Sequence, residues 1–89
     1  MPLIKKELIV KNKQGLHARP AALFVQIANK FDAQITVRHE EEEVNGKSIM
    51  GILMLGAEKD SLIVVEADGT DAEAALVELE KLISSEEEL

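Results

Sequence analysis

The sequence predicts an α+β domain, a two-layer open-faced sandwich in which three helices cover one face of a four-stranded antiparallel sheet, in the order β-α-β-β-α-β-α. Two observations lead to this prediction. Strand-like segments alternate apolar and polar residues, which is typical of an antiparallel sheet with one face in water. Other segments have helical periodicity, and neither a linker nor an internal repeat divides the 89 residues. We expect a single domain over residues 1–85 and a frayed acidic tail at 86–89.

The first strand is expected over residues 3–10, where leucine and β-branched residues dominate. A polar loop ending at Gly15 leads to a helix that begins near Ala18 and runs to residue 31. Its start is placed there because a helix tolerates a proline such as Pro20 only in its first turn. The apolar stripe of this helix, spaced to face a core, consists of Phe24, Ile27, Ala28 and Phe31.

The second half of the chain supplies the remaining elements. We expect, in order, strands at 35–39 and 42–44, a short helix at 48–55 and a strand at 61–67. Gly56 is a typical helix stop. Thr70 and Glu73 have the spacing of a capping box and predict the start of a last helix. The core-facing stripe of that helix consists of Ala72, Ala75, Leu76, Leu79, Leu82 and Ile83.

The composition argues against several classes of protein. The absence of cysteine excludes disulfides, thiolate chemistry and cysteine-based zinc sites. A net charge of -7 makes direct nucleic-acid binding unfavourable, since the phosphate backbone requires clustered Lys and Arg. No apolar run approaches the ~18 residues of a membrane span, and the start of the chain lacks the layout of a signal peptide. We therefore expect a cytoplasmic protein without membrane insertion. We also expect a monomer.

The charge is unevenly distributed along the chain. Residues 1–31 have a net charge of +5, residues 32–47 of -3 and residues 48–89 of -9. A basic first third on an acidic protein is typical of an interaction surface. We expect this third to face phosphate and acidic partner surfaces.

The start of the first helix has an unusual pattern. His17 stands at about the cap position and Arg19 follows in the first turn, without a Ser, Thr, Asp or Asn cap and without an acidic residue. Uncapped amide hydrogens and a guanidinium favour an anion, most naturally phosphate, and a neutral imidazole adds a nucleophile. The same spacing also fits ordinary surface residues, so both interpretations stay open at this point.

A second candidate site begins at Ser48. This serine is expected to cap the short helix, and phosphorylation at the same position is electrostatically compatible with a helix start. Two interpretations of the following apolar residues stay open: Ile49, Met50 and Leu53 remain exposed as a docking patch, or the whole segment is core. His39 has no second ligand at a metal spacing, so we expect a solvated strand residue and no metal site.

At GLHARPAA (residues 15–22) and KSIMG (residues 47–51), the chain resembles the HPr family of histidine-containing phosphocarrier proteins of the bacterial sugar phosphotransferase system. The resemblance extends from about residue 3 to residue 84. It implies that His17 accepts phosphate on Nδ1 from Enzyme I, which phosphoenolpyruvate has charged, and passes it to the IIA domain of a sugar permease. Arg19 matches the arginine that steadies the phosphoryl group. The resemblance implies a phosphoryl carrier, not an enzyme, and one that uses no cofactor.

The resemblance also implies regulation. Ser48 matches the serine that HPr kinase/phosphorylase modifies with ATP, a form that can bind a catabolite-control transcription factor. The matching docking residues are Leu16, Pro20, Ile49, Met50 and Leu53. Gln26 and Asn29 occupy positions of the first helix that are often basic in the family. This difference bears on docking to Enzyme I. A third departure, Leu53 in place of a frequent methionine, preserves apolar volume.

Two alternatives differ from a transport carrier. A regulatory binding module, from a nitrogen, metabolic or catabolite-repression branch of the family, would act through phosphorylated Ser48. The presence of His17 argues against a purely regulatory role in the catabolite-repression branch, which lacks that histidine. A small hydrolase is less well supported, because nothing beside His17 supplies a second acid, base or metal.

Overall fold

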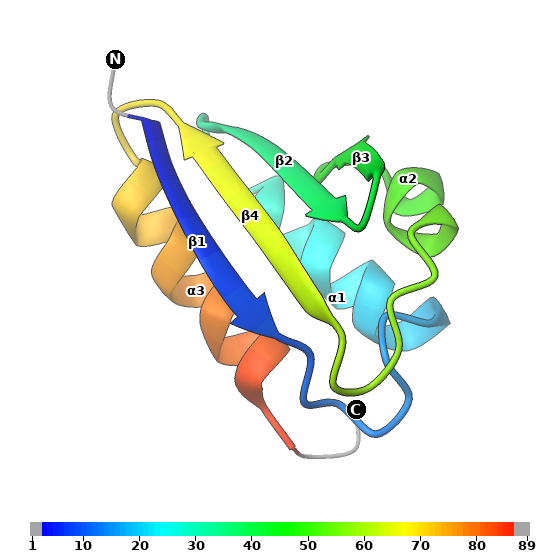
Figure 1. The fold of residues 1–89 in the computed structure, drawn as a ribbon. Coiled ribbons are helices and arrows are strands. Elements are labelled where there is room, and N and C mark those ends of the chain that lie inside the picture. Colours follow the sequence, from blue (N-terminus) through cyan, green and yellow to red (C-terminus); the bar gives the residue numbers. More distant parts are fainter. Residues whose placement is uncertain (1–2, 87–89) are drawn as a thin grey trace.

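The order of elements predicted from the sequence is confirmed in the computed structural model, which describes residues 3–86. Within these residues, four strands form one antiparallel sheet and three helices pack with it (Figure 1). The strands are β1 (Leu3–Ile9), β2 (Gln34–His39), β3 (Glu42–Asn45) and β4 (Leu62–Asp68). The helices are α1 (Ala18–Ala28), α2 (Ile49–Met54) and α3 (Ala72–Ser84). Of the predicted tail at 86–89, Glu86 is exposed and residues 87–89 lie outside the described residues.

The strand order β1-β4-β2-β3 places β1, which leads into the His17 loop, next to β4. β1 and β4 pair antiparallel from Leu3 opposite Asp68 to Ile9 opposite Leu62. Backbone hydrogen bonds extend the pairing beyond the strands, because the Val10 N–H donates to the Ser61 carbonyl at 2.9 Å. The loop after β1 therefore lies against the turn that precedes β4 (Figure 1).

The core lies between the sheet and the helices. β4 alternates as predicted, with Ile63, Val65 and Ala67 buried on the helix side. Phe24 of α1 is fully buried, and all six residues of the predicted α3 stripe are buried, which confirms that stripe. Figure 1 shows α1 and α3 behind the sheet and the short α2 beside β3. The opposite face of the sheet is open, as predicted.

The predicted extent of α1 is too long. The helix ends at Ala28, and Asn29 caps it: its side-chain Nδ2 donates to the Val25 carbonyl at 2.9 Å. Phe31 consequently lies beyond the helix. Its side chain is only half-buried, and so is that of Ile27 within the helix. A polar side chain that binds a carbonyl of the last turn competes with continuation of the helix.

The predicted capping box at the start of α3 is also wrong. The cap residue is Asp71, one position after Thr70, and it makes no side-chain bond to its own helix. Its carboxylate instead accepts the backbone N–H groups of Asp32 at 2.8 Å and Ala33 at 2.9 Å, at the start of β2. The hydrogen bond from Asp32 lowers the pKa of the Asp71 carboxyl; partial desolvation opposes this, and the bond from Ala33 adds to it.

The lowered pKa of the Asp71 carboxyl predicts how the stability of the fold depends on pH. A carboxyl with a lower pKa in the folded than in the unfolded chain stabilises the fold above its unfolded pKa of about 3.9. That stabilisation is lost as the pH falls through the lower, folded pKa. We expect Asp71→Asn to be less stable than wild type near neutral pH, and the difference to shrink below about pH 4.

Denaturant unfolding followed by circular dichroism between about pH 7 and about pH 3 measures this difference. Glu41→Gln removes an exposed carboxylate from the β2–β3 turn and serves as the control. A stability gap between wild type and Asp71→Asn that stays constant across this pH range would contradict the proposed role of the carboxylate.

Candidate functional site

The start of α1 presents unpaired backbone donors, as its sequence predicts. His17 is the cap residue, in an extended conformation, and its side chain makes no capping bond. The N–H groups of Ala18 and Arg19 occupy the first two helical positions and have no acceptor within the helix. Pro20 has no N–H, and the first helical bond runs from the Ala21 N–H to the His17 carbonyl at 2.8 Å. Two amide donors and the positive end of the helix thus lie beside the histidine.

The loop that carries His17 is fixed by a close approach between two backbones. Gly15 has a φ of +67°, and a Cβ atom there would lie 2.7 Å from the Ala57 carbonyl oxygen and 2.8 Å from the Glu58 Cα. The next residue confirms the contact, because the Leu16 N–H donates to the Ala57 carbonyl at 2.9 Å. Glycine at position 15 therefore lets the His17 loop pack against the turn before β4.

This approach brings Glu58 to His17. One carboxylate oxygen, Oε2, lies 3.1 Å from His17 Nε2, and both side chains are more than half exposed. The sequence analysis missed Glu58, which is 41 residues from the histidine. The signal for it is the β1–β4 pairing, since antiparallel strands bring the loop after one next to the turn before the other.

Arg19 is exposed beside these groups. Within residues 3–86 its guanidinium takes part in no ion pair, although four of the lysines do. An arginine without a carboxylate partner retains its donors for an incoming anion.

Ser48 caps α2, which confirms the structural half of its prediction. Its Oγ accepts the Gly51 N–H at 3.1 Å, and its carbonyl accepts the Ile52 N–H at 3.0 Å. The serine is half-buried.

The helix that follows Ser48 has an exposed apolar face, which we call the α2 surface. It consists of Ile49, Met50, Leu53 and Met54, of which Met50 is 64% and Met54 71% exposed. Ile52 and Leu55 are buried, but the other four side chains are exposed, so the interpretation of the whole segment as core is wrong. Met54 is a member that the sequence analysis did not single out.

Two of the predicted docking residues are not on the surface. Leu16 is 1% exposed and belongs to the hydrophobic core, and Pro20 is also fully buried. The physical reason is the contact described above, which ties the loop to residue 57 and places Leu16 in the interior. The prediction that these two side chains form part of the docking surface is therefore corrected.

Two other predicted positions have local structural roles. Asn29 caps α1 and its Nδ2 also lies 3.4 Å from the Lys47 carbonyl, whereas Gln26 is exposed. His39 lies in β2, as expected, but its side chain is only partly solvated, with Nδ1 at 3.1 Å from the Leu55 carbonyl. Within residues 3–86, no group of three or more His, Asp or Glu side chains is placed to hold a metal ion. In the same part of the chain, no helix is long and apolar enough to cross a membrane.

The fold and the site together define a class of protein: a small open-faced α+β sandwich with an exposed histidine at an anion-binding helix start. Comparisons with known proteins identify the family. A family model described as "PTS HPr component phosphorylation site" matches residues 4–85. The chain is 42% identical over 82 residues to phosphocarrier protein HPr of Neisseria meningitidis serogroup A, a match that covers 92% of each chain.

Solved structures agree with this match. A phosphocarrier protein HPr from Bacillus anthracis superposes with a TM-score of 0.90 at 44% identity, covering 93% of this chain and 99% of the other. The Bacillus subtilis catabolite repression protein Crh superposes with a TM-score of 0.73 at 38% identity, covering 90% and 92%. The chain belongs to the HPr family of the phosphotransferase system, and its relatives named HPr are phosphocarrier proteins rather than enzymes.

Proposed function

We propose that this chain carries phosphoryl groups in the phosphoenolpyruvate-dependent sugar phosphotransferase system of the cytoplasm. His17 accepts the group from Enzyme I and passes it to a sugar-specific IIA domain. The observation that carries the proposal is the exposed His17 at the start of α1, beside two amide donors and an arginine that have no partner among residues 3–86. Membership of the HPr family supports it.

The proposed transfer uses positioning and charge rather than covalent machinery from this chain. His17 Nε2 contacts Glu58, so Nδ1 is the ring nitrogen that we assign as the phosphoryl acceptor. The amides at the start of α1 and the Arg19 guanidinium would stabilise the phosphoryl oxygens. An exposed site suits a carrier, because a carrier must release its group about as readily as it accepts it.

The α2 surface is the proposed contact for Enzyme I and IIA domains. Ile49, Met50 and Leu53 are exposed and spaced along one face of α2, and methionine side chains adapt to different partners. Contacts between Cα atoms of α1 and α2 place this surface next to the helix that His17 begins. A partner that covers the apolar residues would also reach the basic first third of the chain.

A regulatory role through Ser48 is the second candidate. The similarity to Crh, a catabolite repression protein, favours it, as does the position of Ser48 beside the α2 surface. In this role HPr kinase/phosphorylase would phosphorylate the serine, and the modified protein would bind a catabolite-control transcription factor. The two roles are compatible in one chain.

Intact-mass analysis tests both proposals. Incubation with Enzyme I and phosphoenolpyruvate is expected to add one acid-labile phosphoryl group. Incubation with HPr kinase and ATP is expected to add one acid-stable group at Ser48. Labelling by ATP alone would overturn the carrier proposal in favour of the regulatory one.

Arg19 is expected to affect the rate of transfer but not the fold. Hydrogen bonds to charged groups contribute about 1.5–3 kcal/mol, so Arg19→Ala is expected to slow uptake from Enzyme I roughly tenfold or more. Arg19→Lys keeps the charge but lacks the planar fork of the guanidinium, so its rate is expected to lie between those of wild type and Arg19→Ala. Single-turnover rates with unchanged circular dichroism measure the effect, and an Arg19→Ala rate equal to wild type would rule out this role.

A further inference from the structure

Glu58 is held in place by the backbone around it. Its N–H donates to the Ser61 Oγ at 3.1 Å, and the Ser61 N–H donates to the Glu58 carbonyl at 3.0 Å. The preceding residue, Ala57, accepts the Leu16 N–H from the His17 loop. The carboxylate is therefore exposed, but the main chain that carries it is anchored on both sides.

We propose that Glu58 is a positioning residue that keeps the His17 proton on Nε2 and so leaves the Nδ1 lone pair free to attack phosphorus. This proposal rests on the proposed function. An ionised carboxylate only accepts hydrogen bonds, so the ring nitrogen 3.1 Å from it must be the protonated one. In a neutral imidazole the hydrogen bond at one nitrogen determines the protonation of the other.

The same contact is suited to the charge that develops during transfer. The Nδ1 lone pair forms the new N–P bond while the bond between phosphorus and the donor atom breaks, and the donor leaves with that electron pair. The proton stays on Nε2, so the phosphorylated ring is an imidazolium. The Glu58 carboxylate then lies next to a positive ring, and the phosphoryl group is bound at the opposite ring nitrogen.

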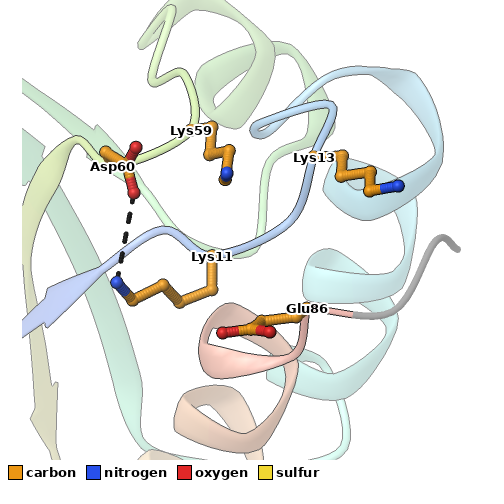
Figure 2. Close-up of a pocket in the computed structure, with 5 residues that line it drawn as sticks. All are labelled: Lys11, Lys13, Lys59, Asp60 and Glu86. Atoms are coloured by element: carbon orange, nitrogen blue, oxygen red, sulfur yellow. Dashed lines mark ion pairs between the residues drawn. The ribbon is translucent and has the colours of Figure 1, made fainter.

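The neighbouring charges form a separate group. Lys11, Lys13, Lys59, Asp60 and Glu86 line a shallow depression of about 200 Å³ (Figure 2). In this group Asp60 pairs with Lys11 at 4.0 Å. Glu58 does not line the depression, and within residues 3–86 it is the carboxylate that contacts His17.

Asp60 thus offers a matched control. Asp60→Asn removes the same charge two positions away, without touching the histidine contact. Asp60 has a φ of +73°, a conformation that asparagine also tolerates. A difference between variants at positions 58 and 60 therefore reports the contact with His17 and not the net charge.

The test combines ¹⁵N NMR of the His17 imidazole at alkaline pH, without Enzyme I, and the single-turnover rate of phosphorylation. We expect wild type and Asp60→Asn to favour the Nε2-protonated tautomer equally. Glu58→Ala should reduce the tautomer ratio and the rate by about two- to tenfold, the factor expected for the loss of one hydrogen bond. Glu58→Gln, whose amide oxygen still accepts the proton, should retain the tautomer.

Identical imidazole spectra for Glu58→Ala and wild type would overturn the proposal for Glu58. That result would leave phosphorylation of the wild type intact. Failure of the proposed function would show differently, because Enzyme I would then leave every variant and the wild type unphosphorylated.

Discussion

Replacement of His17 by alanine is expected to abolish phosphorylation by Enzyme I and phosphoenolpyruvate. The imidazole is the proposed nucleophile, and neither Arg19 nor the amides of α1 can form a bond to phosphorus in its place. The fold should be unaffected, because His17 is exposed and makes no capping bond to α1. Intact-mass analysis and circular dichroism of the variant measure the two expectations.

His39 provides the control for this variant. It is the other histidine of the chain, is half-buried in β2, and has its Nδ1 against the Leu55 carbonyl. His39→Gln is expected to accept phosphate as the wild type does. Phosphorylation of His17→Ala to the wild-type extent would show that the acceptor lies elsewhere.

Replacement of Gly15 by alanine is expected to have the second large effect, on stability and transfer together. A Cβ atom would meet the backbone of residues 57 and 58 at less than 3 Å, and φ at +67° is strained for alanine. Strain and overpacking together predict a loss of about 2–4 kcal/mol in the free energy of unfolding. Uptake of phosphate should slow as well, because relief of the clash moves Glu58 away from His17.

Gly56 isolates the contribution of the close approach. It has a similar φ of +64°, but a Cβ atom there meets nothing within 4 Å. Gly56→Ala should therefore show the backbone strain alone, about 1–2 kcal/mol, and leave transfer unchanged. Equal losses of stability in the two variants, measured by denaturant unfolding, would contradict the proposed contact between the His17 loop and the turn before β4.

Features that depend on local pattern could be predicted from the sequence. The stripe of α3 follows from the spacing of its apolar residues, and its burial is observed. The position of His17 at the uncapped start of α1 follows from Pro20 and from the lack of a capping side chain. Ser48 as a cap follows from residue type and position at the start of a short helix.

Features that depend on contacts between distant segments could not be predicted from the sequence. The contact of Glu58 with His17 requires the register of β1 and β4, and the hydrogen bonds of Asp71 require the start of β2 beside α3. Leu16 stands next to the candidate acceptor in the sequence, yet a backbone bond to residue 57 places it in the core. Residue spacing along one segment contains no information about these partners.

Onward transfer from His17 tests the central claim most directly. The chain would be phosphorylated with Enzyme I, purified, and mixed with a IIA domain that is shown separately to accept phosphate from another HPr. We predict that the phosphoryl group leaves His17 and appears on the IIA domain. Retention of the group on this chain until it is lost to water, with the IIA domain unlabelled, would contradict a carrier function.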